Sequence, residues 1–191
     1  SRTYMWAGNI LIAFFIVLVL FLSICYCNIR IFDEYNKYLY LLMVFALSAV
    51  ASSVTSRIGQ EYFYMVPFTL IALYLLAFFK KRMVFIMYFL SLLPVLLFAP
   101  EGVETFVVYL VAGTVGMFVF EKFNRGWLQF VTALIVFAVM ALIWVSFRLI
   151  DGPGGLIDYG TLLDLALASI LSVAGYPLIF LFEKMFRLVS N

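Results

Sequence analysis

The chain contains no histidine and only two cysteines, and only 12% of its 191 residues are charged. Without histidine, it lacks the usual general base near neutral pH and the commonest metal ligand in proteins. Cys25 and Cys27 lie one residue apart on a predicted helix, so they point to different faces and cannot form a mutual disulfide easily. We interpret them as small apolar residues rather than redox or lipidation sites.

Apolar residues dominate the composition instead. They make up 67% of the chain, and the mean hydropathy is +1.17. A soluble domain carries about 25% charged residues, roughly twice the fraction found in this chain. So little charge cannot cover a surface in contact with water, and the composition therefore predicts a multi-pass membrane protein.

Charged and turn-forming residues divide the chain into seven apolar segments. A helix needs about 20 residues to cross the hydrocarbon core of a membrane. The predicted spans cover residues 8–29, 38–55, 63–79, 83–98, 103–120, 126–147 and 161–182. The fourth and fifth are short, which leaves open a hairpin that does not cross fully. We expect an all-α, seven-helix transmembrane domain over residues 1–191.

The distribution of basic residues predicts the orientation, because cytoplasmic loops retain lysine and arginine. Nine of the twelve basic residues lie at one set of span ends, and three lie at the other. The first set is Arg30, Lys37, Lys80, Lys81, Arg82, Lys122, Arg125, Lys184 and Arg187; the second is Arg2, Arg57 and Arg148. The N-terminus is then outside and the C-terminus is cytoplasmic, which requires an odd number of crossings.

Small residues predict where helices pack closely within the membrane. The expected seams are Ala46, Ala49 and Ser53 on the second span, Ala112 and Gly116 on the fifth, and Ala168, Ser172 and Gly175 on the seventh. Pro94 and Pro177 lie inside spans and predict kinks, whereas Pro67 is expected in the first turn of the third span. A kink could be a signalling hinge or a purely structural feature.

Four charged residues near the outer ends of the spans could form a polar cluster, namely Arg57, Glu104, Arg148 and Asp164. The alternative is that they lie separately at the membrane interface. Asp164 could also close a capping box with Thr161 at the start of the seventh span. The tyrosine-rich stretches "DEYNKYLY" and "EYFYM" are typical of interfacial aromatic belts.

Motifs of enzyme chemistry are absent from the sequence. It has no phosphate-binding loop, no metal-ligand spacing and no nucleophile elbow. We therefore expect no catalytic residues, metal or other cofactor in this chain, and no nucleic-acid partner. Acids at mid-membrane depth and two halves with matching broken helices are also not evident, which disfavours an ion pathway or a transporter.

Three stretches carry a more specific signal when they are taken in order. They are "VPFTLIALYLLAFFKKRMVFIMYFLSLLP", "EGVETFVVYLVAGTVGMFVFEKFNRG" and "YPLIFLFEKMFRLVSN". Together with the predicted topology, they resemble the transmembrane region of the bacterial seven-transmembrane receptors that have an intracellular HD phosphohydrolase domain. The resemblance covers essentially the whole chain.

The resemblance implies a larger protein in the bacterial cytoplasmic membrane. An extracytoplasmic domain would precede the seven spans, and an HD domain would follow them, bind a divalent metal and hydrolyse cyclic di-AMP. Glu183, Lys184 and Arg187 would mark the start of the cytoplasmic linker. The resemblance also implies a homodimer.

Three functions therefore remain to be compared. The first is a sensor or transmission module that couples an outer domain to a cytoplasmic phosphodiesterase. The second is a small transporter or channel for an apolar or lipidic substrate. The third is a passive anchor that only holds a hydrolase at the membrane.

Overall fold

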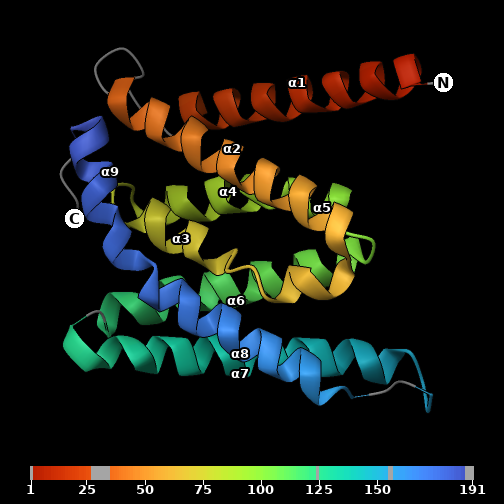
Figure 1. Ribbon diagram of the computed structural model, residues 1–191. Coiled ribbons are helices and arrows are strands. Elements are labelled where there is room, and N and C mark those ends of the chain that lie inside the picture. Colours follow the sequence, from red (N-terminus) through yellow and green to blue (C-terminus); the bar gives the residue numbers. More distant parts are fainter. Residues whose placement is uncertain (1, 27–34, 124, 155–156, 188–191) are drawn as a thin grey trace.

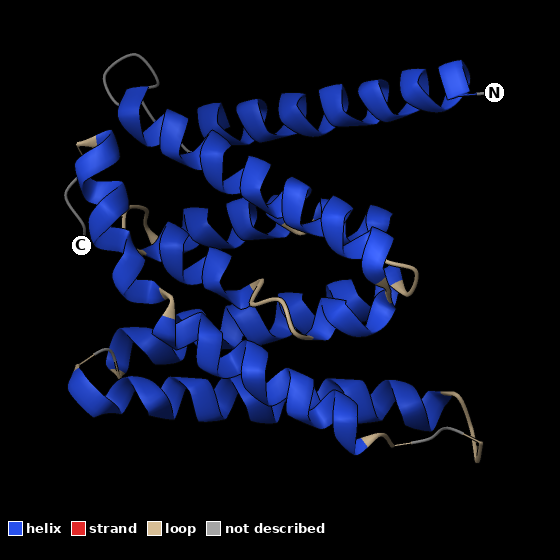
Figure 2. Ribbon diagram, in the orientation of Figure 1, coloured by secondary structure: helices blue, strands red, loops and turns tan. Residues whose placement is uncertain are grey.

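The computed structural model describes residues 2–26, 35–123, 125–154 and 157–187 (Figure 1). These residues form helices joined by loops and turns, and they contain no strand (Figure 2). The prediction of an all-α bundle is therefore confirmed. Cys27, Arg30 and residues 188–191 at the end of the predicted linker lie outside the described residues.

Several helices are interrupted, so the elements outnumber the predicted spans. In chain order they are α1 (Arg2–Tyr26), α2 (Tyr35–Ile58), η1 (Gln60–Tyr64), α3 (Thr69–Leu76), α4 (Lys81–Ser91), α5 (Leu93–Phe98), α6 (Gly102–Lys122), η2 (Gly126–Leu128), α7 (Gln129–Ile150), α8 (Tyr159–Ala174), η3 (Tyr176–Leu178) and α9 (Ile179–Phe186). Elements labelled η are short 3₁₀ helices, which are common at helix ends and breaks.

Within the described residues, six helical stretches are long and apolar enough to cross a membrane. They are Arg2–Ser23, Tyr35–Ile58, Lys81–Phe98, Gly102–Lys122, Gly126–Ile150 and Tyr159–Phe186. Their length and hydropathy identify a multi-pass membrane protein. Each of the six overlaps one predicted span, and the third predicted span is not among them.

The prediction of one continuous helix over residues 63–79 is wrong. The 3₁₀ helix η1 ends at Tyr64, and α3 does not begin until Thr69. Pro67 lies in the loop between them rather than in the first helical turn. Proline lacks a backbone N–H and disfavours the helical conformation of the preceding residue, here Val66, so the helix is interrupted at this point.

We call residues 60–79 the connector, because they join the two ends of the bundle. Figure 1 shows the chain running through η1 and α3 from the end where α2 finishes to the end where α4 begins. The connector contacts α2, α4, α6 and α8. Phe63, Phe68, Ala72 and Leu75 are buried, whereas residues 65–67 of the irregular stretch are half-buried.

The helix α6 forms the centre of the bundle, and it packs against α3, α5 and α7. Its inward face is formed by Thr105, Val108, Tyr109, Ala112, Gly113, Gly116 and Met117. By contrast, α1 lies at the edge of the bundle (Figure 1), and most of its large apolar side chains are exposed. In a membrane protein such a surface faces lipid, which is as apolar as leucine.

The small residues proposed as seams have different positions. Ala112 and Gly116 on α6, and Ala168 and Ser172 on α8, are buried. Gly175 is partly exposed. The proposed seam on the second span is wrong, because Ala46 is exposed while Ala49 and Ser53 are only partly buried. The inward face of α2 instead carries Tyr40, Leu41, Val44, Ser48, Ser52 and Thr55.

Breaks occur near both prolines that were expected to cause kinks. Pro94 lies in the first turn of α5, directly after the interruption at Leu92 that ends α4. Pro177 lies in η3, between α8 and α9.

The expected capping box at Thr161 and Asp164 is wrong. The N-cap of α8 is Asp158, whose carboxylate accepts a hydrogen bond from the backbone N–H of Gly160 at 2.9 Å.

Gly113 allows α4 and α6 to approach each other closely. A Cβ atom at this position would lie 2.1 Å from the hydroxyl oxygen of Tyr88 and 2.2 Å from its Cζ. The Tyr88 ring is 1% exposed, and its hydroxyl donates to the carbonyl oxygen of Tyr109 one turn earlier on α6. The ring therefore has no space into which to withdraw.

We predict that Gly113→Ala lowers the free energy of unfolding by about 1–3 kcal/mol, because overpacking displaces Tyr88 from α6. Thermal unfolding of the detergent-solubilised protein, followed by circular dichroism, measures the change. Gly8→Ala is the matched control, since nothing lies within 4 Å of a Cβ atom at Gly8. Equal melting temperatures for the two variants would contradict the prediction.

Candidate functional site

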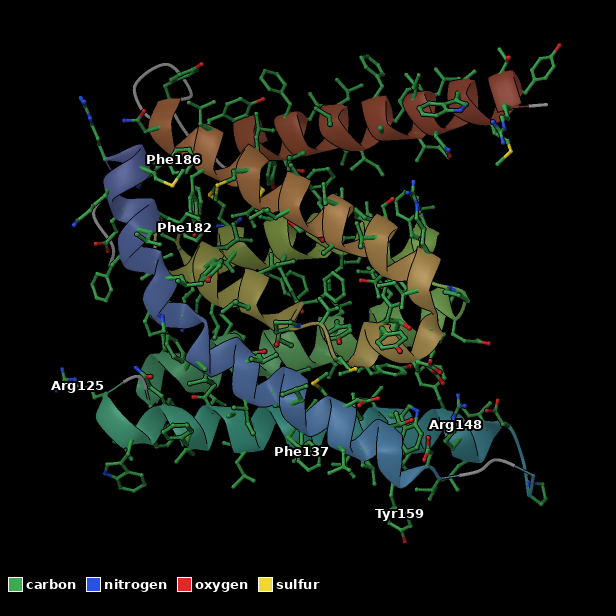
Figure 3. All side chains as sticks on the ribbon, in the orientation of Figure 1. Arg125, Phe137, Arg148, Tyr159, Phe182 and Phe186 are labelled. Carbon is green, nitrogen blue, oxygen red and sulfur yellow. The ribbon has the colours of Figure 1, made fainter. Side chains whose placement is uncertain are left out.

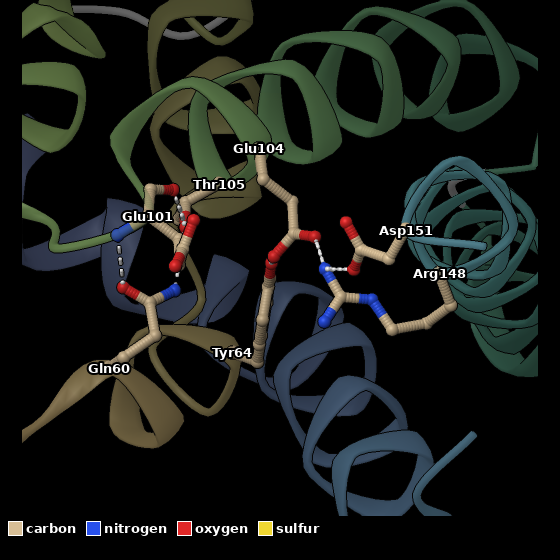
Figure 4. A network of polar contacts seen from close by, with 7 residues as sticks. All are labelled: Gln60, Tyr64, Glu101, Glu104, Thr105, Arg148 and Asp151. Carbon is tan, nitrogen blue, oxygen red and sulfur yellow. Dashed lines mark hydrogen bonds and ion pairs between the residues drawn. The ribbon is translucent and has the colours of Figure 1, made fainter. Parts of the chain in front are cut away.

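A polar network connects α6, α7 and the connector at one end of the bundle (Figure 4). It consists of Gln60, Tyr64, Glu101, Glu104, Thr105, Arg148 and Asp151, and we call it the polar network. Arg148 comes from the last turn of α7, and Glu104 from the first turn of α6. The two helices run antiparallel, so these turns lie at the same end (Figure 1).

Glu104 is the centre of the network, and it is only 7% exposed. One carboxylate oxygen pairs with the guanidinium of Arg148. The other accepts a hydrogen bond of 2.5 Å from the hydroxyl of Tyr64 in the connector. A buried carboxylate requires such partners, because an unpaired charge in an apolar environment is very costly. Glu104 therefore joins α7 to the connector through charge-assisted contacts.

Arg148 is shared between two acids. Its Nη2 atom, which pairs with Glu104, also lies 3.3 Å from a carboxylate oxygen of Asp151. The guanidinium lies over the ring of Trp144 at 5.8 Å from the ring centroid. Its Nε atom is buried and has no hydrogen-bond partner among the described residues. The guanidinium is thus held on several sides, while its Nε donor has no partner in the part of the chain that the structure describes.

A second set of contacts attaches η1 to the start of α6. The side-chain amide of Gln60 donates to the hydroxyl of Thr105 at 2.9 Å. The carbonyl oxygen of the same side chain accepts from the backbone N–H of Glu101, also at 2.9 Å. Gln60 thereby satisfies a free N–H group at a helix start, which has no partner within the helix.

The sequence predicted this site only in part. The structure brings together Glu104 and Arg148, but Arg57 and Asp164 take no part in the polar network as the described residues form it. Asp151 could have been inferred, because a residue three positions after Arg148 shares its helix face. Gln60 and Tyr64 reach the site only through the fold of the connector, and no sequence pattern indicates that.

The break in the connector lies next to Tyr109, a residue of α6 that is fully buried. The Tyr109 hydroxyl donates toward the carbonyl oxygens of Phe63 and Val66, the latter at 2.7 Å. Val66 is one of the non-helical residues, and Phe63 lies in the 3₁₀ helix just before them. Their carbonyl groups therefore lack the backbone N–H partners of a regular helix. Such backbone is tolerated at membrane depth only where protein groups satisfy it. Tyr109 supplies that hydrogen bond.

A second break, between α8 and η3, faces α3. The hydroxyl of Tyr74 donates to the carbonyl oxygen of Gly175 at 2.7 Å. One turn earlier on each helix, the hydroxyls of Thr69 and Ser172 form a hydrogen bond. A Cβ atom at Gly175 would lie 2.8 Å from Cδ2 of Leu70. Helix α3 of the connector is therefore in direct contact with the last helical segment at the point where that segment is interrupted.

An aromatic cluster attaches α9 to the other end of the connector. Tyr40 of α2 packs edge-on against Phe78, with ring centroids 4.7 Å apart, and against Phe186 at 5.7 Å. Tyr74 packs against Phe182 at 5.3 Å. We call Tyr40, Tyr74, Phe78, Phe182 and Phe186 the aromatic cluster. Figure 3 shows Phe182 and Phe186 at the end of the bundle opposite Arg148.

Two tyrosines expected in interfacial belts belong to these buried networks instead. Tyr40 is 0% exposed, and its hydroxyl donates to the carbonyl oxygen of Tyr74 at 2.8 Å. Tyr64 is 4% exposed and bonded to Glu104. The belt prediction fails for both because the connector backbone and Glu104 need hydroxyl partners inside the bundle. Tyr62, at 40% exposed, remains at the surface.

The residues expected to begin the linker lie at the end of α9. Glu183 and Lys184 are in its last turns, and Arg187 follows the helix in a left-handed conformation with φ 52° and ψ 45°. A left-handed residue is a common way to end a helix. Over the described residues, no group of three or more His, Cys, Asp or Glu side chains could hold a metal ion.

We predict that the pair formed by Glu104 and Arg148 has a coupling free energy of about 1–3 kcal/mol, because both groups are largely removed from solvent. A double-mutant cycle of alanine variants, read by thermal unfolding, measures this value. The control cycle uses Lys81 and Glu121, which join α4 to α6 at 2.6 Å but are about 40% exposed. An exposed pair should give about 0–1 kcal/mol. Equal coupling in the two cycles would contradict the prediction.

Comparison with known protein families gives one match. A family model described as a 7TM receptor with intracellular HD hydrolase matches residues 3–190. No curated protein and no solved structure matches the chain. The family match extends over nearly all of the chain and agrees with the resemblance carried by its three sequence stretches. The chain therefore belongs to the family of 7TM receptors with an intracellular HD hydrolase.

Proposed function

We propose that this chain is the transmembrane module that passes a signal from an extracytoplasmic domain to an intracellular HD phosphodiesterase that hydrolyses cyclic di-AMP. The observation that carries the proposal is the continuous set of contacts along the connector. At one end, Tyr64 bonds to Glu104 of the polar network. At the other end, Tyr74 and Phe78 belong to the aromatic cluster that packs against α9.

A change at the polar network has a physical route to the C-terminal end. Rearrangement of the Arg148–Glu104 pair would move Tyr64 and hence η1. The break at residues 65–68 separates η1 from α3, so the two halves of the connector can change their relative angle. Because α3 contacts both α8 and α9 through Tyr74, such a change would alter the position of α9.

Transmission requires two arrangements that differ by only a few kcal/mol, so that an input can bias them. Two features favour such a pair of states. The buried Nε atom of Arg148 has no partner among the described residues, and a buried unsatisfied donor costs about 1–3 kcal/mol. Tyr109 has a single hydroxyl proton but lies near two carbonyl oxygens. Both groups would gain from alternative pairings.

A transporter is the rival function, because broken helices that face each other also form transporter binding sites. The break at Gly175 in the α8–η3–α9 segment faces helix α3 of the connector, through Tyr74 and Leu70, which the sequence did not indicate. However, three carbonyl oxygens at these breaks already lie within hydrogen-bond distance of tyrosine hydroxyls. Tyr109 serves Phe63 and Val66, and Tyr74 serves Gly175. Although Tyr109 has only one proton for its two carbonyls, these contacts within the protein weigh against a role in coordinating an ion or substrate.

The proposed orientation places the polar network outside and α9 on the cytoplasmic side. The uneven distribution of lysine and arginine supports it. The test starts from a variant that lacks Cys25 and Cys27, into which Tyr159→Cys or Arg125→Cys is introduced. A membrane-impermeant maleimide applied to intact cells should label Tyr159→Cys, since Tyr159 is 80% exposed. It should not label Arg125→Cys. Figure 3 places these two residues at opposite ends of the bundle. The reverse labelling would contradict the orientation.

We predict that Tyr64→Phe changes cyclic di-AMP hydrolysis by the natural protein that carries the HD domain. A hydrogen bond to a charged group contributes about 1.5–3 kcal/mol, so its loss should shift a two-state equilibrium about tenfold or more. Hydrolysis by the membrane-reconstituted protein measures the effect. Tyr62→Phe is the matched control, because Tyr62 is exposed at the surface of the same 3₁₀ helix.

The outcomes separate the parts of the proposal. Equal hydrolysis by wild type, Tyr62→Phe and Tyr64→Phe, with equal membrane insertion, would favour the passive anchor over transmission. Failure of the wild-type protein to hydrolyse cyclic di-AMP while it hydrolyses another cyclic nucleotide would refute the proposed substrate alone.

A further inference from the structure

A cavity lies between α2 and the connector, beside the break. Its volume is about 150 Å³. One wall is formed by Val44, Leu47, Ser48 and Ala51 of α2, and the opposite wall by residues 66–68, 70, 71 and 74 of the connector. We call this cavity the α2 pocket. None of its residues takes part in the polar network.

The α2 pocket is suited to an apolar ligand. Of the two hydroxyls in its walls, that of Ser48 donates to the carbonyl oxygen of Ser91 at 2.6 Å. That of Tyr74 donates to the carbonyl oxygen of Gly175 at 2.7 Å. Both donors are therefore already used, and the remaining side chains of the walls are hydrocarbon. A polar ligand would lose its hydration here without gaining hydrogen bonds from these side chains.

The depth of the pocket indicates where its ligand comes from. Its α2 residues, 44–51, lie in the middle of the membrane-spanning helix Tyr35–Ile58. Leu47 at the rim is 51% exposed, so the pocket opens onto the outer surface of the bundle. At mid-depth that surface is surrounded by the hydrocarbon core of the bilayer. Lipid acyl chains are therefore the molecules available at the opening.

The volume is large enough for such a ligand. An apolar protein cavity of about 150 Å³ stays free of water and can bind a molecule as large as benzene. A flexible acyl chain can place several methylene groups in the same space. If the pocket stayed empty, its lining would lose the packing contacts that a dense interior provides.

We propose that the α2 pocket binds the acyl chain of a membrane lipid. The bound chain fills the space beside Pro67 and Phe68 and supports the connector at its break. It also contacts Leu70, whose side chain packs beside Gly175 at the second break. Occupancy of the pocket thereby favours one angle between η1 and α3. This regulatory consequence rests on the proposed function, whereas the binding site does not.

The binding site is tested by photo-crosslinking of the natural protein in liposomes. The probe is a phosphatidylglycerol whose acyl chain carries a diazirine near its middle. Any lipid-facing residue can react with this probe, but Val44 and Phe68 are each only 2% exposed and line the pocket. We expect crosslinks at these two residues, identified by mass spectrometry of peptides.

Filling the pocket should remove these crosslinks. Ala51→Phe places a ring in the pocket and should reduce crosslinking at Val44 and Phe68 at least about fivefold; Ala51→Leu, a milder change, should also reduce it. Ala46→Phe is the matched control, since Ala46 lies on α2 but is exposed and does not line the pocket. It should leave the crosslinks unchanged.

Two results would overturn the inference in different ways. Crosslinks confined to exposed residues such as Leu47, Val50 and Val54, or equal crosslinking in all variants, would refute the binding site. Loss of crosslinking in Ala51→Leu with unchanged cyclic di-AMP hydrolysis would support the site and refute its regulatory effect. If hydrolysis in that experiment still responds to Tyr64→Phe, the proposed function stands without the lipid.

Discussion

The whole bundle depends on hydrogen bonding to an interrupted backbone inside an apolar environment. Water is absent from the membrane interior, so carbonyl groups at a break must find partners within the protein. Tyr109 donates toward the carbonyls of Phe63 and Val66, and Tyr88 donates to the carbonyl of Tyr109. Gly113 leaves the space that the Tyr88 ring needs. The small residues of α6 therefore serve the break in the connector as well as helix packing.

The proposed function requires the connector to be adjustable although it lies inside the bundle. A continuous helix would carry its hydrogen bonds internally and would resist bending. The connector instead depends on side chains from its neighbours at its start, at its break and at its end. Glu104, Tyr109 and Tyr40 supply these contacts from α6 and α2. The proposed function requires these contacts to be exchanged without leaving backbone groups of the connector unpaired in lipid.

The chain belongs to the family of 7TM receptors with an intracellular HD hydrolase, and the proposed transmission would pass through the connector to α9. The helix α9 is the last helix that the structure describes, and the aromatic cluster attaches it to α2 and α3. The ring contacts are edge-on, and contacts of this type are directional and each contribute about 0.5–1.5 kcal/mol beyond area burial. We therefore expect a movement of α3 to carry α9 with it, so that the two helices do not slide past each other.

The sequence predicted the class of fold well, because membrane crossing imposes strong limits on length and hydropathy. Six predicted spans correspond to helices of sufficient length. It failed at residues 63–79, where Pro67 was assigned to a helix start but instead interrupts the segment. Hydropathy could not reveal this break, since the residues around it are as apolar as those of a regular span.

The candidate site was predicted less well for a related reason. Charge and position identified Glu104 and Arg148, which form an ion pair. Tyr64 and Tyr109 were not recognised, because tyrosine is also typical of membrane interfaces and its hydrogen-bond partners here are distant in sequence. Tyr109 is separated from Val66 by 43 positions. Only the fold brings such groups together, so no local sequence pattern predicts these contacts.

The most direct measurement is a double-mutant cycle between the two ends of the connector. Tyr64→Phe removes the contact with the polar network, and Phe182→Leu weakens the aromatic cluster on α9. Hydrolysis by the natural protein is then compared for wild type, both single variants and the double variant. The account predicts a coupling free energy of about 1 kcal/mol or more, because both contacts act on one segment. Additive effects of the two substitutions would contradict it.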